Sequence, residues 1–454
     1  MFSVKFRSLI FIIVVFISSV CFAEDSVVFD LKGCIERVVK FHPELGEFKQ
    51  DVEIYKAKLA EAQAGVFPQI ELMALGGPSP KAEKEAISPE IKTDVKSTTI
   101  NGVFGMITMQ VLQPIYTFGK ISGYKTAAAG GIKVSEAEVD KKRSELILKT
   151  KELYWSLALI RELRTLANEI KEELEKAIKR TEEDLKKEIP YADELTLYKL
   201  KTYFGEVKRN LNEIDKNEAI IIEALKFMTG LSGIKKLEII TPSLKYEELN
   251  IKPDELIAKA FILRPEMIQI REGLKARQAL IDVEKSNLYP QIFFLVKGSL
   301  AGATNRDRIH NPYIYDPLND SMLAAVLGMK LNIDFGITKG KIREAEIEYQ
   351  KIVEKKKLAE SGIPVQIMKA YIELQEATKS AKDMEEAYQN AKKWLVTADA
   401  NLDMGVGDTK DLADAVLAYA TTRVNHLKAL YNQKMAFANL VQASGLDKDE
   451  REVK

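Results

Sequence analysis

The chain has 454 residues, of which 67 are basic and 67 acidic, and it contains two cysteines and three histidines. This neutral balance provides no basic field of the kind that attracts nucleic acid, so we expect no nucleic-acid partner. The histidines lie far apart in sequence, which argues against a clustered metal site. The sequence has no phosphate-binding loop and no supported Ser-His-Asp motif, so we expect neither an enzyme nor a bound cofactor or metal.

The first 23 residues have the features of an export signal. Lys5 and Arg7 precede an apolar run, and small side chains at Cys21 and Ala23 form a cleavage pattern. The run is too short to span a bilayer as a helix, and Val20 stands where a lipobox requires a smaller residue. The sequence therefore predicts an exported protein that begins at residue 24 and contains only Cys34, which leaves no internal disulfide.

The remaining chain contains an internal duplication. Short motifs recur in the same order about 220 residues apart: Pro43-Glu44 with Pro265-Glu266, Phe67-Pro68-Gln69 with Tyr289-Pro290-Gln291, Gly119-Lys120 with Gly340-Lys341, Tyr154 with Tyr371, and Gly230 with Gly445. One such match is weak, but an ordered set is not a chance result. We predict two structural repeats, residues 24–230 and 231–454, each with a helix, two strands and two long helices.

Two segments of each repeat alternate between apolar and polar residues. They are about 67–76 and 103–115 in the first repeat, and about 290–300 and 323–335 in the second. The alternation is typical of transmembrane strands with a lipid face and a wet lumen, and also of a half-buried soluble sheet. The export signal favours membrane strands, and residues 76–101 and 298–321 have the composition of solvated loops.

The contrast between the two faces is sharpest in the last strand. Its polar face contains Lys330, Asn332 and Asp334, which we predict to face the lumen; a buried polar pair in a soluble sheet is the alternative. Four strands cannot close a membrane barrel, because about eight are the minimum and an open edge in lipid leaves backbone groups unsatisfied. Sister chains must then complete the barrel, with two, three or four copies.

Long helical segments follow the strands, at about 131–189 and 191–229 in the first repeat and about 365–404 and 408–443 in the second. Apolar residues recur every seven positions, and the second repeat adds a parallel alanine stripe. A strict heptad keeps an apolar seam against a partner helix. Two stripes favour a wall of packed helices, although an ordinary coiled-coil hairpin has the same heptads. The fold class is therefore mainly α with transmembrane β.

The sequence resembles the TolC-like outer-membrane efflux protein family over essentially all of the exported chain. The resemblance is carried by the duplicated Pro-Glu and aromatic-Pro-Gln motifs, the run from Gln113 to Lys120, and the region 405–415. Gly119-Lys120 and Gly340-Lys341 depart mildly from the family's usual Gly-Arg. The resemblance implies a homotrimer with a shared β-barrel in outer-membrane lipid and a long periplasmic α-barrel. It also implies docking to an inner-membrane transporter through a periplasmic adaptor, and an equatorial region formed by residues 231–260 and the C-terminal tail.

A turn near residue 405 separates the last two long helices. Gly405 and Gly407 can end one helix, and this turn is a candidate adaptor contact. Asp411 and Asp414 follow on one face of the next helix. In the family, an Asp-x-x-Asp-Ala pair lies at the narrow periplasmic mouth, where a three-fold axis would gather six carboxylates into a gate. The plainer interpretation is that acidic residues favour a helix N-terminus.

The sequence thus predicts the outer-membrane duct of a tripartite efflux or type I secretion system. The alternatives are a periplasmic coiled-coil adaptor and a soluble structural coiled coil. An adaptor normally has a single helical hairpin, and a coiled coil has no need for the strand pairs. Cargo and transporter class are not encoded in a recognisable way.

Overall fold

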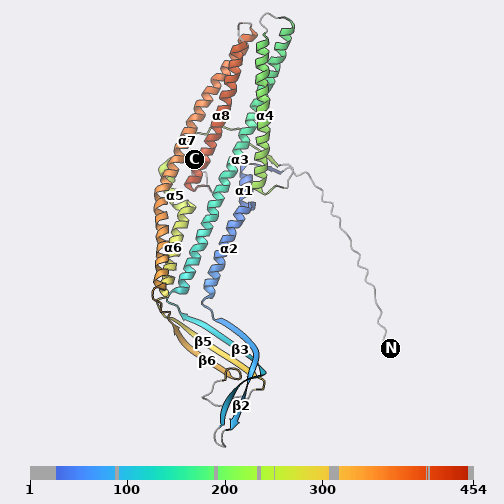
Figure 1. Ribbon diagram of the computed structural model, residues 1–454. Coiled ribbons are helices and arrows are strands. Elements are labelled where there is room, and N and C mark those ends of the chain that lie inside the picture. Colours follow the sequence, from blue (N-terminus) through green and yellow to red (C-terminus); the bar gives the residue numbers. More distant parts are fainter. Residues whose placement is uncertain are drawn as a thin grey trace, which may run out of the picture. The chain divides into compact units, whose positions relative to one another are not determined.

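The computed structural model describes residues 27–86, 92–188, 193–232, 237–249, 251–305, 316–404, 406 and 409–447 (Figure 1). The expected export signal lies outside these residues. The chain forms two compact units. We call them the hairpin unit (Met1–Lys40, Thr150–Lys245 and Ala387–Tyr431) and the sheet unit (Phe41–Lys149, Tyr246–Glu386 and Asn432–Lys454).

Each described helix has a counterpart of the same length in the other repeat. The pairs are α1 (Leu31–Phe41) and α5 (Pro253–Leu263) with 11 residues, α2 (Pro43–Ala64) and α6 (Pro265–Ser286) with 22, α3 (Lys120–Lys186) and α7 (Ile337–Asp403) with 67, and α4 (Glu194–Thr229) and α8 (Thr409–Ser444) with 36. This confirms the duplication predicted from the motifs.

The long helices begin earlier than we expected, at Lys120 instead of residue 131 and at Ile337 instead of residue 365. Glycines do not end α3, because it packs closely on α6 where they occur. A Cβ atom on Gly123 would lie 2.5 Å from Val283 Cγ2, and one on Gly130 would lie 2.9 Å from Ala276 Cβ. These glycines make room for a neighbouring helix.

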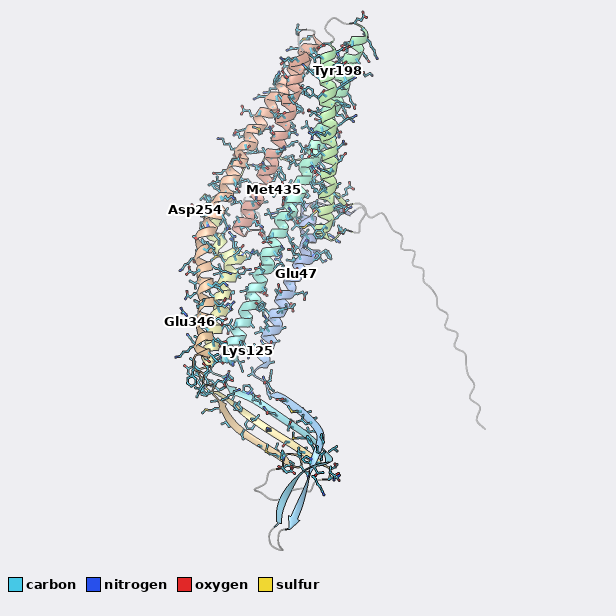
Figure 2. The ribbon with its side chains drawn as sticks, viewed as in Figure 1. Glu47, Lys125, Tyr198, Asp254, Glu346 and Met435 are labelled. Atoms are coloured by element: carbon cyan, nitrogen blue, oxygen red, sulfur yellow. The ribbon has the colours of Figure 1, made fainter. Side chains whose placement is uncertain are left out.

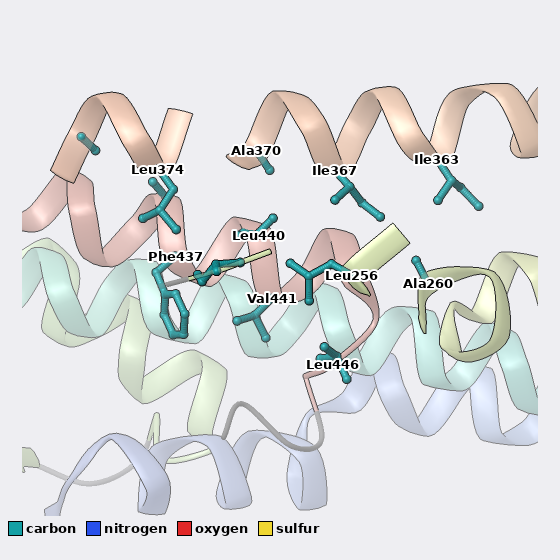
Figure 3. Close-up of a cluster of buried hydrophobic side chains, with 13 residues drawn as sticks. Leu256, Ala260, Ile363, Ile367, Ala370, Leu374, Phe437, Leu440, Val441 and Leu446 are labelled. Atoms are coloured by element: carbon teal, nitrogen blue, oxygen red, sulfur yellow. The ribbon is translucent and has the colours of Figure 1, made fainter. Parts of the chain in front are cut away.

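Pro364 lies inside α7 and does not end it either. A proline removes one backbone hydrogen bond and normally kinks a helix. Here Ile363 and Ile367, on either side, are buried in the main apolar core of the sheet unit, where they join Leu256 of α5 and Leu440 of α8 (Figure 3). Burial of such side chains stabilises by about 1.5–3 kcal/mol each, which offsets the lost bond.

Four strands form one antiparallel sheet in the order β2-β3-β5-β6, which leaves β2 and β6 at its edges. The strands are β2 (Gln69–Ala86), β3 (Lys92–Tyr116), β5 (Gln291–Ala303) and β6 (Ser321–Lys330). The loop expected at 76–101 is therefore mostly strand. Pro78 and Pro80 are tolerated because β2 is an edge strand, and the register shifts beside Pro80.

β6 is shorter than we expected, since it ends at Lys330 and not at residue 335. Lys330 pairs with Gln291, which is the first residue of β5. The neighbouring strand therefore offers no further partner to residues 331–335 within the chain.

The hairpin unit has its own core. β1 (Val27–Phe29) pairs in parallel with β4 (Leu237–Ile239), and Cys34, Leu157 and Leu225 are buried together there. Burial raises the pKa of the Cys34 thiol to about 11, so it is a packing residue rather than a reactive one. The Tyr154 hydroxyl donates to the Ile240 carbonyl oxygen at 2.7 Å.

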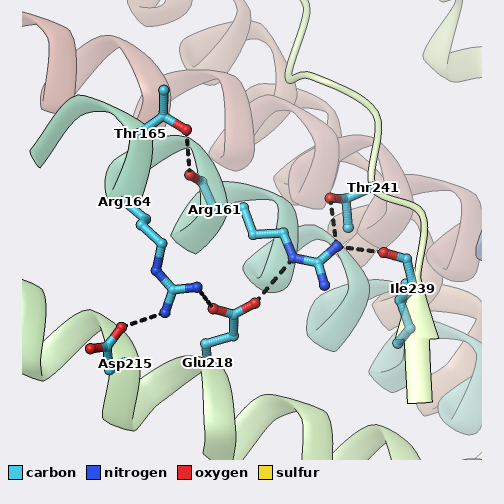
Figure 4. A network of polar contacts seen from close by, with 7 residues as sticks. All are labelled: Arg161, Arg164, Thr165, Asp215, Glu218, Ile239 and Thr241. Carbon is cyan, nitrogen blue, oxygen red and sulfur yellow. Dashed lines mark hydrogen bonds and ion pairs between the residues drawn. The ribbon is translucent and has the colours of Figure 1, made fainter. Parts of the chain in front are cut away.

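An ion-pair network holds the segment after β4 against the long helices (Figure 4). Glu218 of α4 accepts from Arg161 Nε at 3.1 Å and pairs with Arg164, which also pairs with Asp215 at 2.5 Å. Arg161 also donates to the Ile239 carbonyl oxygen and to the Thr241 hydroxyl. The network therefore joins α3, α4 and the chain that follows β4.

Candidate functional site

The first two turns of α8 present two carboxylates to solvent. Asp411 and Asp414 are both exposed, while Ala415 is fully buried. The helix therefore turns the acidic pair outward and places the small alanine against the rest of the hairpin unit. This is the arrangement that an acidic mouth requires, although a solvated helix N-terminus looks the same within one chain.

Asp411 has a partner that the sequence did not indicate. The indole Nε1 of Trp394, on α7, donates to Asp411 Oδ1 at 3.3 Å. The bond crosses from α7 to α8 and orients one of the two carboxylates. The two residues are 17 positions apart in the sequence, on different helices, and no local pattern marks them as partners.

The chain between α7 and α8 exposes large apolar side chains. Met404 is 69% exposed and Val406 77% exposed. Gly405 and Gly407, the predicted adaptor contact, lie outside the described residues. The beginning of α4 is similar, since Leu195 is exposed and so is Tyr198, which is labelled in Figure 2. Asp193, for which no function was predicted, caps α4 by accepting from the Leu195 N–H at 2.9 Å.

The sheet has one strongly apolar face. Ile70, Leu72, Leu323, Leu327 and Met329 are between 70% and 78% exposed, and the register places them on the same side of the sheet. Exposed apolar side chains in such a continuous set are not stable in water and indicate a surface that is covered in the assembled protein.

Of the three predicted lumen residues, only Lys330 lies within a strand, on the face opposite Leu327 and Met329. Asn332 is exposed beyond the end of β6. Asp334 accepts from the Thr338 N–H at 2.9 Å and from the Gly336 N–H at 3.1 Å, at the start of α7. A hydrogen bond from the Thr338 hydroxyl, together with these backbone bonds, lowers the pKa of Asp334. Its described contacts are those of a helix-capping residue.

The junctions between strands and helices explain two sequence motifs. Lys120 Nζ donates to Asn287 Oδ1 at 3.0 Å, which ties the start of α3 to the turn before β5. Lysine therefore has a defined role where the family pattern has arginine. Phe118 has a positive φ of 47° and stacks on Tyr289 with ring centroids 5.1 Å apart, which joins the two repeats at this junction.

Among the helices of the described ranges, none has a stretch both long and apolar enough to cross a membrane. The same ranges contain no group of three His, Cys, Asp or Glu side chains able to hold a metal ion.

Residues 256–446 match the family model described as outer membrane efflux protein. No curated protein matches the sequence significantly. The fold is similar to the Campylobacter jejuni CmeC outer membrane channel, with 16% identity, a TM-score of 0.74, and coverage of 93% of this chain and 88% of that one. It is also similar to the outer membrane protein VceC from Vibrio cholerae, with 16% identity, a TM-score of 0.73, and coverage of 91% and 96%.

The open state of the Neisseria gonorrhoeae MtrE outer membrane channel is another similar structure, with 16% identity, a TM-score of 0.72, and coverage of 92% and 90%. These similarities extend over nearly the whole of each chain. They confirm the TolC-like fold class and the resemblance inferred from the motifs, and they give no support to the alternative of a periplasmic adaptor.

Proposed function

We propose that this TolC-like chain is the outer-membrane duct of an efflux or type I secretion system, through which an inner-membrane transporter passes its cargo to the outside. The observation that carries the proposal is the two-faced sheet. One face is continuously apolar and exposed, and the charged residues of the four-stranded part lie on the other. Lipid on one side and water on the other is the environment that suits such a surface.

The edges of the sheet support an assembly of several copies. β2 and β6 form the two edges, and an edge in lipid leaves backbone N–H and C=O groups without partners. Pairing β6 of one copy with β2 of the next removes every edge when the ring closes. Three copies of four strands would give a 12-stranded barrel, which is within the range of known membrane barrels.

The exposed apolar side chains near the helix turns support a docking role. Met404, Val406 and Leu195 project from the ends of the two helical hairpins. A periplasmic adaptor that bound there would cover these side chains and connect the duct to a transporter. In such an arrangement the transporter selects the cargo.

The function is tested by fractionation and by conductance. Cells expressing the chain should carry it in the outer-membrane fraction as an SDS-resistant, heat-modifiable trimer, and the purified protein should conduct ions across planar bilayers. A monomer that stays soluble without detergent and never conducts would refute the duct.

The acidic pair is proposed as a gate at the periplasmic mouth. Gathered by a three-fold axis, Asp411 and Asp414 would attract cations and bind trivalent ions. The double variant Asp411→Ala/Asp414→Ala should conduct more and lose block by a trivalent cobalt complex. The matched control, Asp383→Ala/Asp399→Ala, removes two exposed carboxylates from α7 and should keep the block. Unchanged currents and unchanged block in the first variant would reject the gate.

A further inference from the structure

The four-stranded part of the sheet, residues 69–77, 104–113, 291–303 and 321–330, contains three charged residues: Glu71, Lys297 and Lys330. All three lie on the same face. Glu71 lies between Ile70 and Leu72, Lys297 follows Phe294 and Val296, and Lys330 follows Leu327 and Met329. Leu72, Val296 and Met329 belong to the apolar face, so the charged residue beside each of them lies on the opposite face. The charges are therefore sorted completely to one side.

The register places two of these charges in one row. Glu71 of β2 is paired with Gln110 of β3, and Gln110 is paired with Lys297 of β5. The row ends on β6 at Ala324, which is paired with Lys297. Neighbouring strands are about 4.8 Å apart, so the backbones of Glu71 and Lys297 are about 10 Å apart with Gln110 between them.

The residues of this row are chemically complementary. The Gln110 amide has an N–H donor suited to a carboxylate and a carbonyl oxygen suited to an ammonium group. Thr108 and Ser299, paired in the adjacent row on the same face, are also polar. In the row on the other side, Leu112 of β3 and Leu295 of β5 are apolar, and the polar residue is Gln69 at the start of β2. The row is therefore a narrow polar band that crosses three strands.

Lys330 stands apart from this band. It is paired with Gln291, which is six residues before Lys297 along β5. Six residues of strand span about 20 Å. This exceeds the Debye length of about 10 Å at 0.1 M salt, so the band and Lys330 act on a passing ion separately.

We propose that Glu71, Gln110 and Lys297 form a charge-balanced selectivity band on the water-filled face of the barrel, and that this band keeps the outer part of the duct nearly indifferent to the sign of a small solute's charge. This inference rests on the proposed duct. Each copy contributes one negative and one positive side chain, so the ring has no net charge, and a duct that leaves cargo choice to its transporter benefits from such neutrality.

The test measures the reversal potential of purified, bilayer-inserted protein in a KCl gradient centred on 0.1 M. Glu71→Gln should shift the potassium-to-chloride permeability ratio towards chloride, and Lys297→Gln should shift it towards potassium, each by about two-fold or more. The double variant Glu71→Gln/Lys297→Gln should return close to the wild-type ratio. Both single shifts should shrink at 1 M KCl, because salt screens the fixed charges.

Two matched controls isolate the effect of charge. Lys297→Arg keeps the positive charge, and Ser299→Ala changes a neutral neighbour on the same face, so both should keep the wild-type ratio. Heat-modifiable trimers and single-channel currents establish that each variant is assembled. If wild-type protein never conducts, the duct itself is refuted. If wild type and all variants conduct with the same permeability ratio, the duct stands and the selectivity band is refuted.

Discussion

The two repeats agree in their helices and disagree in their strands. The paired long helices have 67 residues each and the returning helices 36 each. By contrast, β2 has 18 residues against 13 for β5, and β3 has 25 against 10 for β6. Helices that pack side by side along their length must keep a common length, whereas strands can vary at a free end. The comparison indicates that the lengths of the packed helices are constrained and that the lengths of the strands are not.

One equivalent position shows how the same task is performed with different chemistry. In the first repeat, Arg161 and Glu218 form an ion pair, and Arg161 holds the chain after β4. The equivalent positions in the second repeat, about 216 residues later, are occupied by Thr378 and Gln433. Gln433 donates to Thr378 at 3.3 Å and to the Glu247 carbonyl oxygen at 2.7 Å. Both repeats therefore bind the segment that connects them, one through charges and the other through an amide.

The need for equal helix lengths in the two repeats can be tested by lengthening the helices of one repeat. Seven residues added to both α3 and α4, on the turn side of Arg164 and Asp215, preserve the heptad but extend that hairpin by about 10 Å. We expect loss of the SDS-resistant oligomer, since the lengthened hairpin no longer matches α7 and α8. The same insertion in all four helices should restore it. An oligomer unaffected by the one-sided insertion would contradict a shared helical wall.

Substitutions at the equivalent positions Glu218 and Gln433 should have a smaller effect, on the free energy of unfolding. Gln433 is 1% exposed, so Gln433→Glu buries a carboxylate and should lower the free energy of unfolding by about 2–5 kcal/mol. Glu218→Gln leaves two partly exposed arginines without their shared carboxylate, and we expect about 1–3 kcal/mol. Denaturant unfolding measures both losses. If Gln433→Glu were neutral, the amide would not be essential to the second repeat.

The strand difference should matter least. The part of β2 and β3 that extends beyond the four-stranded sheet, Pro78–Ala86 and Lys92–Val103, continues as a two-stranded ribbon. At the base of this ribbon, β3 is also hydrogen-bonded to Thr304 and Asn305. Replacing the ribbon, with the chain between, by a short turn makes the first strand pair resemble the second. We expect the trimer to form and its melting temperature to change by only a few degrees, as measured by heat-modifiable electrophoresis. Failure to assemble would show that this ribbon takes part in closing the barrel.

The sequence predicted the architecture better than the boundaries. Heptads and alternation depend on period, so they identified the long helices and the strands correctly. Gly130 and Pro364 were misleading as boundaries, because neighbouring helices override local propensity there. The partner of Asp411 was missed because the contact with Trp394 joins two helices across a turn. The band of Glu71 and Lys297 also required the strand register, which no local pattern specifies.

The parallel pairing of β1 with β4 affects the order in which the protein can fold. Val27 is paired with Leu237, about 210 residues later in the chain. As the chain is synthesised, β1 therefore lacks its partner strand until the residues up to β4 have followed it. Contacts between such distant positions form slowly, and until then the nascent protein exposes an unsatisfied strand that invites aggregation. A holding chaperone during this interval would protect Val27–Phe29 most, and the helical hairpins, whose contacts are local, least.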